Sequence, residues 1–522
     1  MKDNTYLLDD SSSPPSIKFA PVFNAAVPFI DRHLAEGRAD KVAIVTETEA
    51  VTYRELSERV NRAGHALLSL GMEPAQRVLM VVKDCPEFFY VFFGAVKAGI
   101  VPVPVNTLMR ISDYEYLIEN SECTALVHSS DFNDTMSDAL AIVDQRPDHI
   151  LTVEDLTAKM ADQSSEMAPA KTTEDTVCFW LYSSGSTGNP KGVVHPHRSM
   201  VYTSQCSGVD TIGIREDDIC FSVSKLFHSY GFGNALSFPL WVGATIVLSD
   251  QKVSPAMSFE MIERFRPTLF FGVPTLYAQQ LHAMETSDPD TSSIRHCVSA
   301  GEALPADVFQ RWKERTGTII LDCLGSTEAL HFFIGNTTTD FNPGTSGRRI
   351  NRYELRIVDE AGNEVERGDI GTLHVRGGST AIEYWKYPEK TAATMLADGW
   401  LNTGDMYSQN DERCYVNGGR GDDMLKVGGL WCSPTEIEAC LIEHEKVLEA
   451  AVVGRADPDG LIKPEAHVVL NNQADASAEL EADLLEHCKA GIARYKYPRW
   501  FQFVDELPKT VTGKIQRFKL RQ

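Results

Sequence analysis

Residues 182–192 read YSSGSTGNPKG, a stretch of glycine, serine and threonine that follows the apolar run at residues 176–181. The apolar run has the length of a buried strand, so we predict that the glycine-rich stretch is the loop leaving this strand. Glycines let the backbone approach a ligand and turn its N–H groups inward, while the hydroxyls and Lys191 add donors and a positive charge. Ordered sequence resumes at residues 192–195, which disfavours a flexible linker. The stretch is therefore interpreted as a polyphosphate-binding loop.

Other nucleotide-binding and nucleophile motifs do not match this chain. A Walker A loop requires a glycine–lysine pair followed by serine or threonine, but Lys191 follows a proline and the pair at residues 513–514 is followed by isoleucine. The dinucleotide pattern G-x-G-x-x-G fails because Leu236 stands where the third glycine belongs after the glycines at 231 and 233. The esterase pattern G-x-S-x-G is absent as well.

Strand and helix patterns alternate from residue 41 to about residue 321. Apolar strand patterns at residues 41–45 and 77–82 flank a helical pattern at residues 53–70, which ends at Gly71. This alternation is typical of parallel sheets covered by helices on both faces, so we predict an α/β fold with two doubly wound layers packed against each other. Further strands are expected at residues 101–105, 219–223, 245–248, 269–272, 296–299 and 318–321, and further helices at residues 24–34, 87–97, 235–240, 258–265, 277–284 and 306–316.

The character of the chain changes at both ends of this region. Residues 1–25 are polar and contain prolines, so they are expected to be loosely ordered. After Gly344, short alternating segments separated by turns predict a small antiparallel β-barrel. A glycine-rich break at residues 418–423 precedes a compact α+β segment. We therefore predict an N-terminal domain of residues 1–421 and a C-terminal domain of residues 422–522.

The composition limits the partners and the compartment. With 49 basic and 73 acidic residues the formal charge is −24, which disfavours nucleic acid and anionic membranes as partners. No apolar run approaches the roughly 20 residues of a membrane span, and the N-terminus lacks the pattern of a secretion signal, so a soluble cytoplasmic protein is expected. The eleven cysteines lack C-x-x-C spacing, which favours reduced thiols without a specific role over disulfides or a zinc site.

Six further motifs occur in a fixed order along the chain. They are KLFHSYGFG at residues 225–233, SAGEALP at 299–305, DCLGSTE at 322–328, LNTGD at 401–405, GRGDDMLK at 419–426 and LPKTVTGKI at 507–515. Together with the glycine-rich loop they resemble the motifs of the adenylate-forming superfamily, which includes acyl-CoA synthetases, peptide-synthetase adenylation domains and luciferases. The resemblance covers residues from about 40 to 520. It implies a large domain that binds ATP and an acid, and a small mobile domain that carries a catalytic lysine.

The resemblance implies roles at the nucleotide for residues that alone would be ordinary turn or surface groups. Glu328 matches a Mg²⁺ ligand, a role that requires a hard oxygen donor. Asp405 and Arg420 match residues that hold the ribose, and Asp322 matches the acceptor of the adenine amino group. Leu324 stands where most members carry a tyrosine stacked on adenine, and an aliphatic side chain can still cover a ring face. The implied ATP site comprises Ser183, Ser184, Gly185, Ser186, Thr187, Gly188, Lys191, Gly301, Glu302, Ala303, Asp322, Cys323, Leu324, Gly325, Ser326, Thr327, Asp405, Arg420 and Lys514.

Lys514 resembles the catalytic lysine that reaches from the small domain to the substrate carboxylate and the α-phosphate. A carboxylate and a triphosphate repel each other, and a positioned cation stabilises the transition state more than the ground state. For thiol capture, Asp422 matches the hinge of the small domain, and Lys426, Gly428 and Gly429 match the segment that meets coenzyme A. The implied catalytic residues are Lys514, His228, Lys426, Thr187 and Glu328, with His228 as the aromatic gate beside the carboxylate.

Aromatic and aliphatic residues in these motifs suit a flat, apolar acid. The motifs look closest to benzoate-CoA ligases and their hydroxy- and aminobenzoate relatives, and Phe332 departs from the aliphatic residue expected there. The sequence does not choose between benzoate, 2-aminobenzoate and 4-hydroxybenzoate as the acid. The thiol acceptor can be coenzyme A or a carrier protein, and a homodimer is a possible assembly. A non-catalytic scaffold is disfavoured because the catalytic residue types are retained. The implied acid site comprises His228, Tyr230, Phe232, Ala300, Gly301, Leu324, Gly325, His331, Phe332 and Lys514, with Phe271 beside it.

Overall fold

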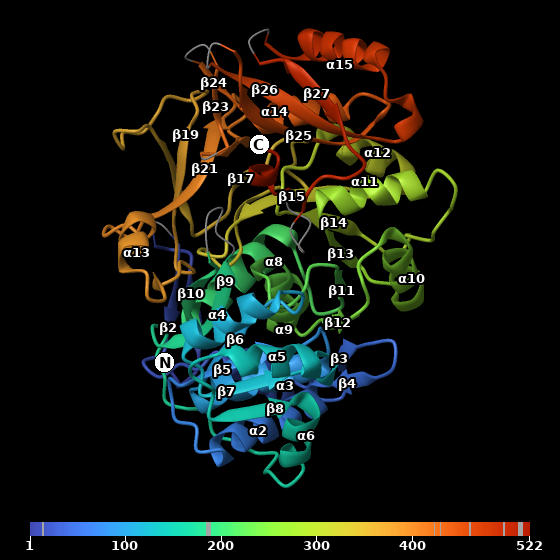
Figure 1. The fold of residues 1–522 in the computed structure, drawn as a ribbon. Coiled ribbons are helices and arrows are strands. Elements are labelled where there is room, and N and C mark those ends of the chain that lie inside the picture. The colour runs from blue at the N-terminus through green and yellow to red at the C-terminus, as the bar shows by residue number, and fades with distance from the viewer. Residues whose placement is uncertain are drawn as a thin grey trace.

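The computed structural model describes residues 1–12, 15–183, 189–421, 423–427, 430–458, 461–493, 496–509 and 515–521. Figure 1 shows a large body that contains most of the chain and, at the top of the view, a smaller body built from the C-terminal elements. No helix in these described ranges combines the length and the apolar character needed to cross a bilayer.

Two β-sheets organise the large body, as predicted (Figure 1). The larger sheet is parallel at its centre and has antiparallel strands at both edges. Its strand order is β17 (Arg348–Arg349), β16 (Phe332–Gly335), β15 (Ile320–Gly325), β14 (His296–Ser299), β13 (Leu269–Gly272), β11 (Ile219–Ser222), β12 (Thr245–Val247), β3 (Val42–Val45) and β4 (Ala50–Thr52). The second sheet is parallel throughout, in the order β6 (Val101–Pro104), β5 (Arg77–Val81), β7 (Ala125–His128) and β8 (His149–Thr152).

Both faces of the larger sheet are buried, which explains the unbroken apolar runs of its strands. In β13, Leu269 and Phe271 belong to the core between the two sheets, whereas Phe270 packs on the opposite side against α10 (Pro255–Phe265), α11 (Pro274–Ala283) and α12 (Ala306–Thr316). The outer face of the smaller sheet packs against α4 (Ile111–Ser121) and α5 (Asn133–Ile142).

Helices α2 (Tyr53–Ser69) and α3 (Pro86–Ala98) contribute many side chains to the core between the sheets. Helix α2 begins at a capping box in which Thr52 and Glu55 satisfy each other's backbone N–H groups. Helix α3 is buried at every residue except Glu87 and ends at Gly99, whose φ of +79° is the left-handed conformation that glycine favours.

The glycine-rich stretch joins β9 (Val177–Ser183) to β10 (Lys191–Pro196), so it does leave a strand as predicted. The two strands are antiparallel and place Ser183 opposite Lys191. Strand β20 (Glu383–Tyr384) pairs with β10 from much later in the chain. The remaining helical elements of the large body are η1 (Val27–Asp31), α1 (Arg32–Ala35), η2 (Ser130–Phe132), α6 (Val153–Met160), α7 (His197–Thr203), η3 (Ser204–Ile212), α8 (Ser229–Phe232), η4 (Gly233–Ser237), α9 (Phe238–Val242) and α13 (Pro388–Thr394).

Two expectations about the large body need correction. The segment after Gly344 forms an antiparallel sheet in the order β18 (Glu354–Val358), β19 (Gly371–Arg376), β21 (Leu401–Gln409) and β22 (Tyr415–Arg420). Its edge strands β18 and β22 do not pair with each other in the described residues, so the sheet is open rather than a closed barrel. The N-terminus is also more ordered than expected, because β1 (Tyr6–Asp9) and β2 (Ser16–Phe19) form a hairpin.

The smaller body has a core of its own. Its sheet, in the order β25 (Val447–Ala456), β26 (Ile462–Leu470) and β27 (Trp500–Phe503), packs against α14 (Pro434–Ile442) and α15 (Ala478–Gly491). The hairpin of β23 (Leu425–Val427) and β24 (Leu430–Cys432) precedes α14. Two short helical segments, η5 (Gln473–Asp475) and η6 (Arg517–Lys519), complete this part of the chain.

Five buried histidines should make the fold sensitive to mild acid. Burial lowers the pKa of His33, His195, His197 and His331 to about 3 and that of His296 to about 4. Below the unfolded value of about 6.5 the unfolded chain binds protons that the folded chain does not, so stability is lost as the pH falls. Each group contributes up to about 1.4 kcal/mol per pH unit in this range.

Urea denaturation at pH 7, 6 and 5 checks this prediction. We expect the free energy of unfolding to fall at each step. The buried carboxyls of Asp84 and Asp322 act in the opposite direction, because burial raises their pKa values and the folded state then holds their protons more tightly. A free energy of unfolding that stays level from pH 7 to pH 5 would refute the prediction.

Candidate active site

A cavity of about 180 Å³ lies where the carboxyl ends of strands from both large sheets meet. The segments after β6, β11, β13, β14 and β15 contribute to its walls. In open α/β sheets, ligands bind in the crevice outside the carboxyl ends of the parallel strands. The residues assigned to the site from sequence that line this cavity are Ser183, His228, Tyr230, Ala300, Gly301, Glu302, Gly325, Ser326, Thr327, His331 and Phe332.

Tyr230, at the start of α8, contributes its aromatic ring to the cavity wall. Its hydroxyl donates to the backbone carbonyls of Gly272 at 2.9 Å and of Val298 at 3.0 Å, at the ends of β13 and β14. Burial raises the pKa of Tyr230 well above its usual value. Since the hydroxyl is engaged by the backbone, the ring is the part of Tyr230 that we expect to contact a ligand.

His331 and Phe332 form a second aromatic pair on the wall, with ring centroids 4.0 Å apart. Burial lowers the pKa of His331 to about 3, so the ring is neutral, and its Nε2 lies 3.2 Å from the carbonyl oxygen of Tyr230, to which it donates. Glycines make this packing possible. A Cβ at Gly325 would lie 2.4 Å from the carbonyl oxygen of His331, and one at Gly233 would lie 2.2 Å from the imidazole ring.

Phe232 does not line the cavity, contrary to the expectation from sequence. It is fully buried, stacks on Phe179 at 4.9 Å and meets the edge of Phe92 at 5.2 Å. Tyr230 and Phe232 lie two positions apart on α8, about 200° around a helix, so only one of them can face the cavity. Phe271 likewise belongs to the core between the sheets.

His228 precedes α8 and lines the cavity, with its ring 4.4 Å from that of Phe227. Asp84, which follows β5 in the other sheet, holds this loop: its Oδ1 accepts from the backbone N–H of Leu226 at 3.1 Å, and its Oδ2 lies 3.6 Å from Nζ of Lys225. Burial raises the pKa of Asp84. Sequence reasoning missed Asp84, and its position at the end of a predicted parallel strand was the only signal available.

Lys191 and Glu328 meet through a residue that sequence reasoning also missed, Tyr384. The ammonium group of Lys191 lies 4.5 Å from the centre of the Tyr384 ring, and the Tyr384 hydroxyl donates to Oε1 of Glu328 at 2.8 Å. Tyr384 reaches this place because β20 pairs with β10. A carboxylate held beside a lysine provides a hard oxygen donor for Mg²⁺ next to a cation for phosphate, which fits the implied metal.

Replacing Tyr384 by phenylalanine should weaken Mg²⁺-dependent activity. The variant keeps the ring beside Lys191 but removes the hydrogen bond to the Glu328 carboxylate. A hydrogen bond to a charged group contributes about 1.5–3 kcal/mol, so we expect roughly a 10- to 100-fold loss of pyrophosphate release, with a higher Mg²⁺ requirement. Tyr387→Phe, which loses a 3.0 Å contact with the hydroxyl of Tyr116, is the matched control. An unchanged Mg²⁺ titration curve would show that Tyr384 does not orient Glu328.

Neighbouring groups hold the loop that carries Thr327. His195, neutral because burial lowers its pKa to about 3, donates from Nε2 to the Thr327 carbonyl at 2.9 Å. The hydroxyls of Ser229 and Thr327 lie 3.5 Å apart. Ser326 accepts from the backbone N–H of Ala329 at 3.2 Å. Thr327 is thus held from two different elements at the rim of the cavity.

The residues assigned to adenine lie outside this cavity. Asp322 is buried, its pKa is raised by burial, and its Oδ1 has no hydrogen-bond partner within the described ranges. An unpartnered carboxyl oxygen suits the amino group of adenine. Leu324 packs against the main core, and the Cys323 side chain lies within it. Neither Leu324, Cys323 nor Ala303 lines the cavity.

The two residues assigned to ribose are brought together by strand pairing. Asp405 on β21 and Arg420 on β22 are direct partners across the antiparallel ladder, although they are far from the cavity motifs in sequence. Lys426 lies in β23, where it pairs with Trp431 of β24. The remaining assigned residues lie outside the described ranges: Ser184, Gly185, Ser186, Thr187, Gly188, Asp422, Gly428, Gly429 and Lys514.

Two family models match the chain. The AMP-binding enzyme model matches residues 31–385, and the AMP-binding enzyme C-terminal domain model matches residues 436–514. Among curated proteins, the chain is 47% identical over 520 residues to a benzoate–CoA ligase of Thauera aromatica, covering 98% of both. It is 43% identical to a 4-hydroxybenzoate–CoA/benzoate–CoA ligase of Rhodopseudomonas palustris, covering 96% of this chain and 94% of the relative.

Solved structures agree with these matches. The anthranilate CoA ligase AuaEII in complex with anthranoyl-AMP superposes with a TM-score of 0.92 at 39% identity, covering 96% of this chain and 97% of that one. A benzoate CoA ligase from Burkholderia xenovorans superposes with a TM-score of 0.88 at 40% identity, covering 96% of this chain and 100% of that one. The chain therefore belongs to the AMP-binding enzyme family, the adenylate-forming superfamily.

Proposed function

We propose that this protein is an ATP-dependent aryl acid:CoA ligase that forms AMP. The observation that carries the proposal is the cavity of about 180 Å³, walled by Tyr230, His331 and Phe332, beside the Lys191–Tyr384–Glu328 corner. The cavity is small compared with the roughly 300–1,000 Å³ of drug-sized ligand sites, which favours a single-ring acid over a long chain. The similarity of the whole chain to benzoate–CoA ligases supports the same assignment.

In the first step a carboxylate oxygen of the acid attacks the α-phosphorus of ATP, and the bond to pyrophosphate breaks. We assign the triphosphate to residues 183–191, the ribose to Asp405 and Arg420, and the adenine amino group to Asp322. When bound at Glu328, Mg²⁺ would neutralise charge on the phosphates. Lys514 would stabilise the charge that develops between the carboxylate and the α-phosphate.

In the second step the sulfur of coenzyme A attacks the acyl carbon, AMP leaves, and the thiol proton passes to solvent. We assign residues 422–522 to a mobile domain that turns about Asp422 and exchanges Lys514 for the segment around Lys426, Gly428 and Gly429. His228, on the cavity wall, is assigned as the gate between the acid and the thiol. Delivery to a carrier-protein thiol is the alternative for this step.

An AMP-release assay over a panel of acids tests the proposal. The panel should contain benzoate, 2-aminobenzoate, 4-hydroxybenzoate, cyclohexane acids and fatty acids of short and medium length. We expect a benzoate to be used best, with thioester forming from free coenzyme A. Preference for a medium-chain fatty acid would overturn the aryl assignment. An adenylate that accumulates without thioester would favour the carrier-protein alternative.

Phe332→Val should change which acids are used. Phe332 lines the cavity and its ring lies 5.7 Å from that of Tyr230, so removing the ring enlarges the space for the acid. We expect kcat/KM for bulkier ring-substituted benzoates to rise about tenfold relative to benzoate, within the range that pocket methylenes control. Tyr230→Phe, which keeps the wall ring, is the control and should leave the ratio unchanged. An unchanged ratio in Phe332→Val would mean that this ring does not limit the acid.

A further inference from the structure

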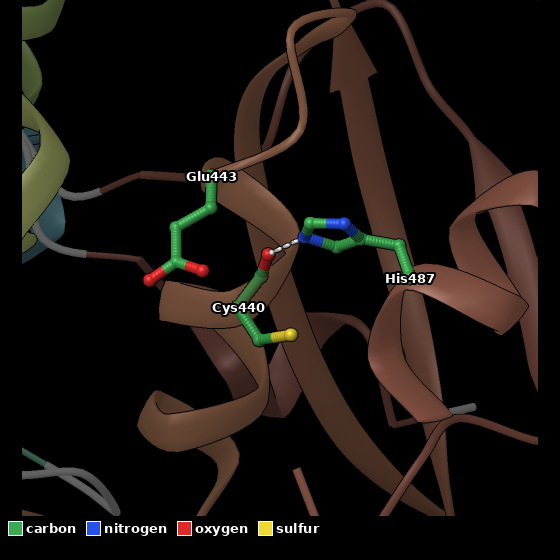
Figure 2. A group of neighbouring side chains, drawn as sticks. All are labelled: Cys440, Glu443 and His487. Atoms are coloured by element: carbon green, nitrogen blue, oxygen red, sulfur yellow. Dashed lines mark hydrogen bonds between the residues drawn. The ribbon is translucent and has the colours of Figure 1, made fainter. Parts of the chain in front are cut away.

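A cluster of metal-ligating side chains lies between the two helices of the smaller body. Cys440, on α14, and Glu443, at the end of that helix, approach His487 on α15, and their ligand atoms all lie within 4.8 Å of one another. Figure 2 shows the three side chains gathered around the end of α14. None of these residues lines the cavity described above. The cluster therefore needs its own explanation.

The cluster borders the apolar core of the smaller body on one side. Cys488, which follows His487 on α15, packs in the same core as Cys440. Cys440 and Cys488 are buried, His487 is half-buried and Glu443 is exposed, so the cluster has one side open to solvent.

The donor types indicate which metal would fit. One sulfur and one imidazole form the soft to borderline set that zinc accepts, a carboxylate oxygen adds a third ligand, and a water molecule can complete a tetrahedral site. In such a site neighbouring ligand atoms are about 3.5 Å apart, given bonds of about 2.3 Å to sulfur and about 2.0 Å to nitrogen or oxygen. The cluster would have to contract by about 1 Å from its present spread of 4.8 Å. The exposed side chain of Glu443 can supply much of this movement by rotation.

We propose that Cys440, Glu443 and His487 form a zinc-binding site that links α14 to α15. Nε2 of His487 now donates to the backbone carbonyl of Cys440 at 2.8 Å (Figure 2). To bind zinc, this nitrogen gives up that bond, and the ring takes the tautomer protonated at Nδ1. The Cys440 thiol loses its proton to solvent, so zinc binding releases a proton and strengthens as the pH rises.

The site would add a link between elements that already share the apolar core of the smaller body. Cys440 and Cys488 both belong to that core, together with Leu441 and Leu484. Zinc that binds the folded chain more tightly than the unfolded chain raises stability by mass action. The expected effect is therefore on the stability of this body, in addition to any effect on turnover.

Titration of the chelator-treated full-length protein with Zn²⁺ and with Co²⁺ tests the proposal. We expect one equivalent of Zn²⁺ to bind with proton release, detected by calorimetry in buffers of different ionisation enthalpy, and to raise the Tm. Co²⁺ should produce a thiolate charge-transfer absorption band. Cys440→Ala should remove this band and weaken Zn²⁺ binding at least tenfold. Cys414→Ala, another buried free cysteine, is the matched control and should leave both unchanged.

A second variant keeps the proposal testable if Cys440→Ala fails to fold. Glu443→Gln alters an exposed side chain, so folding should be unaffected, and Zn²⁺ binding should weaken about tenfold. Three results would each overturn the proposal: no Zn²⁺ bound, a Co²⁺ spectrum without a thiolate band, or binding that survives both variants unchanged.

Discussion

Replacing Lys514 by alanine is expected to slow adenylate formation by about 100-fold or more, because the developing negative charge loses its positioned cation. The expectation rests on the motif at residues 507–515 and on the family to which the chain belongs. The described residues on either side of the segment are attached to the smaller body by ion pairs. Nζ of Lys509 lies 2.6 Å from Glu449, and a guanidinium nitrogen of Arg517 lies 2.7 Å from Glu438.

Pyrophosphate release measures the first step directly. Lys519→Ala is the control, because it removes a lysine from the same C-terminal tail and should leave the rate unchanged. Supplying a preformed aryl adenylate together with coenzyme A separates the two steps. We expect Lys514→Ala to use the adenylate at close to the normal rate. A variant with an unaltered first-step rate would remove Lys514 from the mechanism.

Gly94→Ala is expected to destabilise the whole protein by about 3 kcal/mol or more, because the added methyl group has no space. Gly94 lies on α3 where it crosses α2 between the two large sheets. A Cβ at Gly94 would lie 2.7 Å from the backbone nitrogen of Gly64 and 2.9 Å from the carbonyl oxygen of Val60. Both atoms are backbone of a buried helix, so relief requires the helices to move apart within a close-packed core.

Urea denaturation of the variant and the parent protein gives the difference in free energy of unfolding. Gly208→Ala is the matched control, since its added Cβ would meet the Phe238 side chain at 3.1 Å, and a side chain can adjust. We expect the control to lose clearly less stability than Gly94→Ala. Equal losses would show that backbone crowding between α2 and α3 is not the cause.

Much of the fold follows from local pattern. Strands β13 and β14 and helix α12 have the bounds expected from sequence, because each is an apolar or amphipathic run bounded by turn residues. Gly99 ends α3 with the left-handed conformation that its position predicted. The open sheet formed by β18, β19, β21 and β22 was predicted less well, because whether a sheet closes depends on its edge strands, and no short window of sequence contains both.

The candidate site, like the fold, could be predicted from the sequence only in part. His228, Gly325 and Thr327 were found from their motifs and do line one cavity. Phe232 was assigned to that cavity wrongly, because the motif does not reveal the rotation of α8 about its axis. Asp84 and Tyr384 were missed because each acts on a residue more than fifty positions away. The contacts of Asp84 and Tyr384 form only when β5 and β20 pair with their neighbouring strands.

The order of strands and helices, the position of the glycine-rich stretch after a strand, and the family were determined by the sequence alone, because they depend on residues close together in the chain. The tertiary structure decided which rings face the cavity, which hydroxyl holds Glu328 and which metal-ligating side chains meet between α14 and α15. The physical reason is that burial and short contacts between distant residues arise from the pairing of strands and the packing of helices. A linear pattern of residue types does not contain those distances.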